Sequence, residues 1–148
     1  MKQMIGTLAA MAVGGAALAH SGATGVVKER MDAMVALAEA MKVIVPMSRG
    51  QVAYDADAYA EAARRIASHS GQPLVEKFPE GSLVAPSEAA PAIWEDLDRF
   101  ADLSTTLEER AEALAQAAAT SDSPPGAEFA AMAQTCGACH EDFRIEAD

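Results

Sequence analysis

The stretch FAAMAQTCGACHEDF, residues 129–143, has the spacing of an amphipathic helix and carries both cysteines of the chain. Its large apolar and sulfur-containing side chains recur at steps of three and four residues: Phe129, Met132, Cys136, Cys139 and Phe143. Residues at this spacing lie on one face of an α-helix. The spacing therefore predicts a helix whose two thiols face a helical core.

The length and composition of the chain favour one helical domain. Its 148 residues are enough to bury one core but not two. Half of the residues are hydrophobic, yet only 5% are aromatic, and alanine is frequent. A core of that kind is built from small side chains on closely packed helices.

Three further segments have helical periodicity: residues 27–45, 55–70 and 87–119. Strong helix breakers separate the segments: Pro46, Gly71 and SDSPPG at residues 121–126. We expect Pro46 to end the first helix. Four amphipathic helices joined in this way predict an all-α, antiparallel four-helix bundle.

Residues 72–87, QPLVEKFPEGSLVAPS, contain three prolines and few periodic positions. This pattern predicts an ordered loop that crosses one end of the bundle. Leu74 and Phe78 are its large apolar residues, and we expect them to hold the loop against the helices.

The first 19 residues, MKQMIGTLAAMAVGGAALA, are typical of a secretory signal peptide. Lys2 precedes an uncharged apolar run, and Ala17-Leu18-Ala19 fits the small-x-small cleavage pattern. A membrane anchor is less favoured, because the run is short and lacks a basic stop on its far side. The pattern predicts export to the periplasm and a mature domain of residues 20–148 with no membrane span.

The formal net charge is −11, and loss of Lys2 with the signal peptide would change it to −12. Nucleic-acid binding needs clustered lysines and arginines that this chain lacks. Its acidity instead favours a partner protein with a basic surface.

Cys136, Cys139 and His140 form a C-x-x-C-H sequence that is compatible with three chemistries. A disulfide would close a loop too small to constrain the unfolded chain strongly, and redox-active pairs normally begin a helix. Structural zinc needs four ligands, and the chain has no second pair of cysteines or histidines at suitable spacing. Covalent haem attachment uses this sequence itself, since two thiols add to the haem vinyl groups and the adjacent imidazole binds iron. We favour haem.

The sequence resembles the class II cytochromes c, the family of cytochrome c′ and its low-spin relatives. In that family C-x-x-C-H lies near the C-terminus of a four-helix bundle and is followed by a short acidic stretch and Phe-Arg, as in CGACHEDFR at residues 136–144. VVKERMDAM (26–34) resembles the first helix of the family. FPEGS (78–82) and PAIWEDLDRF (91–100) resemble its loop and the start of its third helix.

The resemblance implies a role for each residue of the site. It assigns thioether links to Cys136 and Cys139, proximal iron ligation to His140, and one covalent haem c to each chain. It also places Arg30 at a haem propionate, where a charge-assisted hydrogen bond is favourable because water is partly excluded.

Two further residues are expected near the haem. Arg144 follows His140 by one helical turn, so we expect it beside the imidazole, where it would influence the iron potential. Trp94 lies in the segment that resembles the pocket-forming third helix, and it either contacts the porphyrin or packs in the core.

Met34 separates two kinds of haem protein. In the family, the residue four positions after the arginine lies over the open face of the haem. An apolar residue there leaves iron five-coordinate and open to nitric oxide or carbon monoxide, whereas methionine can bind as the sixth ligand. Methionine is common in this region and also fills cores, so Met34 fits a packing role too. Met31 is the one credible substitute ligand.

The leading hypothesis is a periplasmic single-electron carrier of the low-spin branch, with His140 and Met34 as axial ligands and redox proteins as partners. It is not an enzyme, because no distal histidine and arginine pair is placed to cleave a peroxide. The alternative is a five-coordinate protein of the cytochrome c′ type that binds nitric oxide or carbon monoxide. Family members often pair through their first two helices, which leaves a homodimer open.

Overall fold

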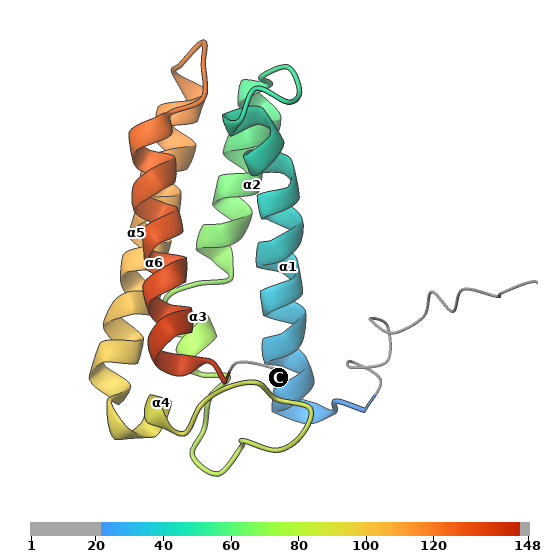
Figure 1. Ribbon diagram of the computed structural model, residues 1–148, viewed down its shortest axis with the longest axis vertical. Helices are drawn as coiled ribbons and strands as arrows, with labels where there is room; N and C mark the ends of the chain where they lie inside the picture. The colour runs from blue at the N-terminus through green and yellow to red at the C-terminus, as the bar shows by residue number, and fades with distance from the viewer. Residues whose placement is uncertain (1–21, 146–148) are drawn as a thin grey trace, which may run out of the picture.

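Four long helices run alternately up and down in the computed structural model, which describes residues 22–145 (Figure 1). The long helices are α1 (Gly25–Ser48), α2 (Ala56–Ser68), α5 (Leu97–Ala119) and α6 (Gly126–Phe143). Two short helices, α3 (Gln72–Val75) and α4 (Ala92–Glu95), lie in the connection between α2 and α5. The antiparallel four-helix bundle is confirmed. The predicted signal peptide, residues 1–19, and His20, the expected first residue of the mature domain, lie outside the described residues.

The helices pack unevenly around the bundle. α1 packs against α2, α2 against α5 and α5 against α6, but the backbones of α1 and α6 hardly approach each other. In Figure 1, α1 and α6 form the front layer, and α2 is seen between them. One side of the bundle is therefore open along the face that α6 turns toward α1.

The core consists of two groups of buried side chains. The larger group joins α1, α2, α5 and α6 through small residues such as Ala63 and Ala111, with Tyr59 and Leu114 between them, all fully buried. The smaller group lies at the end crossed by the loop, where the rings of Phe78 and Phe143 pack edge-on against the ring of Phe100 between them. The expected core of closely packed small residues is thus present, with an aromatic cluster at one end.

Two predicted helix boundaries are wrong. Pro46 lies inside α1 and does not end it. It sits in the last turn, where the missing N–H removes one hydrogen bond, and the Arg49 N–H still donates to Val45 O at 3.0 Å. The predicted helix 87–119 is divided into α4 and α5 at Asp96, whose backbone leaves the helical region (φ −140°, ψ 63°) and whose carboxylate accepts from the Arg99 N–H at 3.2 Å to cap α5.

The predicted loop after α2 is largely confirmed. Leu74 and Phe78 are buried and hold it against the helices, although its first residues form α3. Gly71, at φ +66°, allows the sharp turn into α3, and a side chain there would collide with the carboxylate of Glu108. Within residues 22–145, none of the helices is both long and apolar enough to cross a membrane.

Candidate haem-binding site

The C-x-x-C-H sequence lies in the last two turns of α6. Cys136 and Cys139 are both half-buried free thiols. Burial raises the pKa of each, and for Cys139, burial followed by the charges of Cys136 and Asp142 raises the pKa to about 11. Thiols with raised pKa values are protonated at neutral pH and react slowly with disulfides. These are not the properties of a redox-active cysteine pair.

A structural zinc site lacks its ligands. In the part of the chain that the structure describes, no three His, Cys, Asp or Glu side chains come together in a way that could hold a metal ion. A closed zinc site needs four such ligands. Of the three chemistries compatible with the motif, haem attachment is the one that the surroundings of the cysteines fit.

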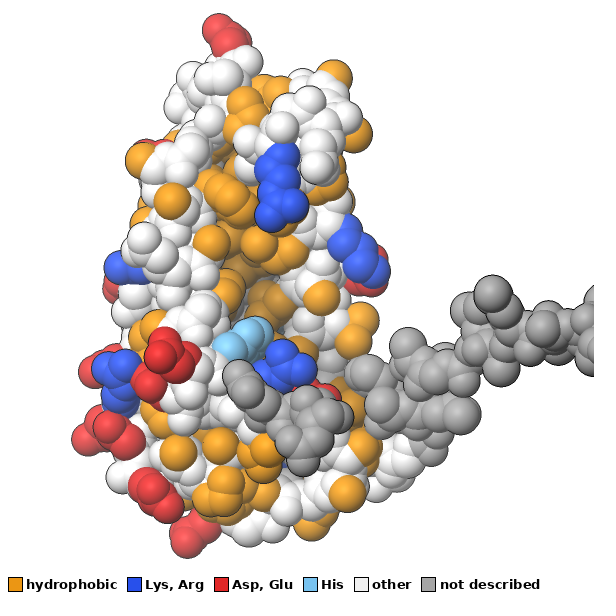
Figure 2. Space-filling view, in the orientation of Figure 1, with side chains coloured by type: hydrophobic (Ala, Val, Ile, Leu, Met, Phe, Trp, Pro, Cys, Tyr) orange, Lys and Arg blue, Asp and Glu red, His pale blue; other side chains and the backbone are white. Residues whose placement is uncertain are grey.

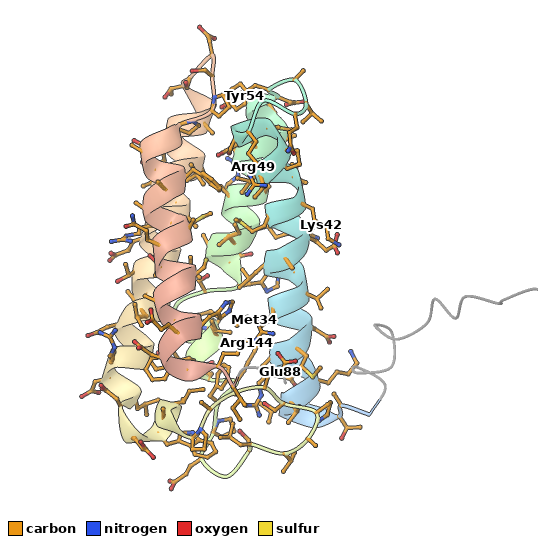
Figure 3. The ribbon with its side chains drawn as sticks, in the orientation of Figure 1. Met34, Lys42, Arg49, Tyr54, Glu88 and Arg144 are labelled. Atoms are coloured by element: carbon orange, nitrogen blue, oxygen red, sulfur yellow. The ribbon has the colours of Figure 1, made fainter. Side chains whose placement is uncertain are left out.

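A groove lined by hydrophobic side chains runs between α6 and α1, with a histidine at its lower end (Figure 2). Met34 enters it from α1 and is half-buried against the aromatic cluster that also includes Phe143 and receives Cys139. Figure 3 shows Met34 of α1 and Arg144 at the end of α6 near each other in the lower part of the space between the two helices. The groove is therefore where a flat apolar group attached to α6 would lie.

His140 is exposed to solvent, whereas Cys136 and Cys139 are half-buried. Partial burial, and then the positive charge of Arg144, lower the pKa of His140. A lowered pKa favours the neutral imidazole at pH 7, which is the form that ligates iron.

Arg30 is a buried cation without enough partners. Its side chain is 3% exposed, its guanidinium lies 4.8 Å from the centroid of the Phe78 ring, and burial lowers its pKa. Nη2 donates to Ser82 O at 2.5 Å and to Ser82 Oγ at 3.0 Å. Nε and Nη1 are buried and make no hydrogen bond to the described residues. Two unpaired nitrogens on a buried cation are costly, so an anion fits here, as a haem propionate would.

Trp94 lies at the same end of the bundle. It is half-buried against the aromatic cluster, and its Nε1–H donates to Phe78 O at 3.0 Å. This hydrogen bond fixes the indole against the loop next to Arg30. Contact of Trp94 with a porphyrin stays a prediction.

Arg144 lies just past the end of α6, and its expected influence on the imidazole stays a prediction. α6 ends at Phe143, and Arg144 adopts an extended conformation (φ −115°, ψ 135°), although its N–H still donates to His140 O at 3.2 Å. Its guanidinium forms an ion pair with Glu88, with Nε–Oε2 and Nη2–Oε2 distances of 2.9 and 2.6 Å. At this point residues 88–90 pair with residues 143–145 through backbone hydrogen bonds, which takes the chain out of the helix.

Sequence reasoning missed Ser82 and Glu88. Ser82 holds Arg30, and Glu88 holds Arg144, across separations of 52 and 56 residues. Neither belongs to a periodic pattern. The resemblance of FPEGS to the family's loop was the one signal that included Ser82.

The whole helical region matches a known family. The family model described as cytochrome C′ covers residues 25–144, from the start of α1 to the residue after α6. The chain belongs to the cytochrome c′ family. Cytochrome c′ proteins bind haem c covalently, and the C-x-x-C-H of this chain is the corresponding motif, so haem c is its cofactor.

Individual relatives carry more than one name. A cytochrome c′ from Pararhodospirillum photometricum is 36% identical over 120 residues, which are 80% of this chain and 94% of the relative. A cytochrome c-556 from Agrobacterium tumefaciens is 30% identical over 122 residues, 82% of this chain and 98% of the relative. A solved nitric oxide complex of a single-residue variant of cytochrome c prime from Alcaligenes xylosoxidans has a TM-score of 0.72 and 26% identity, covering 82% of this chain and 94% of that one. These matches support the cytochrome c′ family and do not support the narrower assignment to a low-spin Met/His branch.

Proposed function

We propose that the protein is a haem protein of the cytochrome c′ type that leaves one axial position open to nitric oxide or carbon monoxide. The observation that carries the proposal is the apolar groove opposite the C-x-x-C-H motif, in which Met34 packs against the aromatic cluster. The nitric oxide complex of the Alcaligenes xylosoxidans relative supports the same chemistry. The hypothesis of an open axial position therefore has better support than the hypothesis of a Met34-ligated electron carrier, which the sequence favoured.

Each residue of the site has a proposed task. Cys136 and Cys139 form the thioether links, and His140 provides the proximal ligand. Haem supplies the iron that binds the gas or exchanges an electron. Arg30 donates to a propionate from Nε and Nη1 and is held for this by Ser82, as its buried unpaired nitrogens indicate. Trp94 packs against the edge of the site and limits the entry of water.

A second candidate is the electron carrier with Met34 as sixth ligand. It is favoured by the position of Met34 on α1, across the groove from the motif-bearing helix (Figure 3). A thioether opposite an imidazole would stabilise the ferrous iron and favour electron transfer. In either case the protein is a carrier or binder and not an enzyme.

The proposed setting of the protein is the periplasm, reached through the signal peptide of residues 1–19. The net charge of −11 supports redox partners with basic surfaces, because opposite charges accelerate encounter. A homodimer through α1 and α2 is consistent with exposed Val35 and Val43 on α1.

The test is an absorption spectrum of the purified holoprotein, ferric and ferrous, with and without carbon monoxide. An open site gives broad high-spin bands that change on adding the gas, and Met34→Ala then strengthens binding by removing a side chain from the groove. If Met34 ligates iron, the spectrum has sharp low-spin bands that do not respond, and Met34→Ala makes them respond.

Two control variants separate the alternatives. Met31→Ala tests the substitute ligand, and Met41→Ala removes a methionine that packs against the larger core group on the same helix. We expect neither to change the response to carbon monoxide. Low-spin, unresponsive bands in the unaltered protein would refute the open site in favour of the second candidate.

A further inference from the structure

The end of α6 is joined to the loop before α4 by a short piece of backbone pairing. The Ala90 N–H donates to Phe143 O at 2.9 Å, and the Ile145 N–H donates to Glu88 O at 2.8 Å. These two bonds flank an isolated antiparallel bridge that includes Arg144. The pairing therefore holds the backbone of residues 88–90 against that of residues 143–145, within reach of an ion pair between Glu88 and Arg144.

The ion pair between Glu88 and Arg144 is held by two hydrogen bonds. Two nitrogens of the Arg144 guanidinium, Nε and Nη2, donate to the same Glu88 oxygen at 2.9 and 2.6 Å. Both side chains are about half exposed, at 50% and 51%. Holding two long side chains together normally costs conformational entropy. That cost is smaller here because the flanking hydrogen bonds already fix both backbones.

The pair lies at the mouth of the haem site. Figure 3 shows Glu88 and Arg144 at the lower end of the groove, with Met34 just above them. The backbone N–H of Arg144 donates to His140 O at 3.2 Å, so the two residues lie one turn apart at the end of α6. The guanidinium therefore belongs to a residue in direct contact with the proximal ligand.

We propose that Glu88 is a positioning residue for the haem centre, which keeps the Arg144 guanidinium at the lower end of the groove, where its charge raises the reduction potential of the iron. A positive charge near iron favours the ferrous state, because the ferric state carries one more positive charge. Without Glu88 to hold it, the side chain of Arg144 extends into solvent, and its influence on the iron falls. The proposal rests on the haem site described under the proposed function.

The competing explanation is that the pair only fastens the end of α6. Exposed ion pairs contribute little to stability, so a fastening role predicts a small change in the free energy of unfolding and none in the potential. A second competing explanation is that Glu88 acts on the iron directly through its own charge. That effect depends on the carboxylate being present and not on its contact with Arg144.

The test uses Glu88→Asp, which keeps the negative charge but withdraws the carboxylate by one methylene. We measure the midpoint potential of the holoprotein for the unaltered chain, Glu88→Asp, Arg144→Gln and the double variant. Glu88→Asp is expected to lower the ferrous-to-ferric ratio at fixed ambient potential about threefold. For a one-electron couple this corresponds to a midpoint potential lower by about 28 mV. In the Arg144→Gln background, Glu88→Asp is expected to have no effect.

A matched control is Arg99→Lys, which preserves charge while disturbing the Arg99–Asp142 ion pair at the same end of α6. We expect it to leave the potential unchanged. The proposal is overturned if Glu88→Asp has a potential equal to or above that of the unaltered protein, or if its shift persists in the Arg144→Gln background.

These outcomes are distinct from a failure of the proposed function. The potential is measurable whether iron has five or six ligands, so the carbon monoxide test and the potential test give independent answers. A chain that carries no haem would have no iron couple to titrate, and that result would refute the proposed site and not the role of Glu88.

Discussion

The two opposite sides of the bundle are built differently. Between α2 and α5, small residues such as Ala63 and Ala111 let the helices approach closely, and the larger Leu114 is fully buried. Between α1 and α6 the backbones hardly approach each other, and the side chains facing the gap are half-buried. One interface is thus complete with protein atoms alone, whereas the other needs a further group. Stability and function are assigned to separate sides of the same four helices.

The largest expected effect tests the interface between α2 and α5, which is the closed side of the bundle. Leu114→Ala removes a fully buried side chain, and we expect the free energy of unfolding to fall by about 3 kcal/mol. Leu97→Ala is the control, because Leu97 is 44% exposed, and it should change stability by less than about 0.5 kcal/mol. Urea unfolding followed by circular dichroism measures both. Similar losses for the two leucines would mean that the closed side is not the stabilising one.

The second largest effect tests the open side of the bundle, between α1 and α6. Arg30→Gln removes the proposed propionate partner, and we expect the holoprotein to lose about 2 kcal/mol of unfolding free energy. Arg64→Gln, at an exposed position of α2, is the control and should have little effect. In chains made haem-free by Cys136→Ala and Cys139→Ala, the loss from Arg30→Gln should shrink or reverse, since the unpaired buried N–H groups disappear with the side chain. An equal loss with and without haem would contradict the assignment of Arg30.

A smaller effect concerns pH and the unmodified chain before haem attachment. Burial raises the pKa of Cys139 from 9.0 to about 11. The unfolded thiol therefore releases its proton first as pH rises, and the resulting stability is fully present below about pH 9 and lost toward pH 11. We expect a decline on the order of 1–2 kcal/mol over this range. The haem-bearing chain has no free thiols, so the same titration by urea unfolding should show no such decline from Cys139.

The smallest effect is expected at the surface. Arg99→Gln breaks the ion pair with Asp142, in which Arg99 is about half exposed. We expect a loss of unfolding free energy smaller than that of Arg30→Gln, which decreases further at high salt. Thermal unfolding at two salt concentrations measures it. A loss as large as that of Arg30→Gln would show that the end of α6 depends on its surface charges.

The closed side was the easier one to predict from the sequence. Helical periodicity is a local signal, and it located the four long helices and the face that carries Cys136 and Cys139. Asp55, the first residue of the predicted segment 55–70, caps α2, since its carboxylate accepts from the Ala58 N–H at 3.0 Å. Local rules failed at Pro46, because the loss of one hydrogen bond in the last turn of a helix costs little free energy. They also failed at Asp96, because one capping side chain divided the predicted helix into two.

The open side was harder to predict because its contacts join distant parts of the chain. The residue types of the motif pointed to haem, and the resemblance pointed to Arg30. The partners of the two arginines, Ser82 and Glu88, lie in a loop without periodicity and are brought to the site only by the tertiary fold. The same pairing ended α6 at Phe143 and moved Arg144 out of the position that a continuous helix would have given it.

The position of the motif in α6 also determines how much of the chain must be synthesised before haem can be attached and its absorbance observed. Ribosomes synthesise α1, α2 and α5 before Cys136, so a polypeptide that terminates early can carry three of the long helices but no thioether. Red absorbance therefore reports chain completion as well as cofactor attachment. In an expression culture, the ratio of absorbance to total polypeptide would measure the fraction of chains that were both translated through His140 and joined to haem.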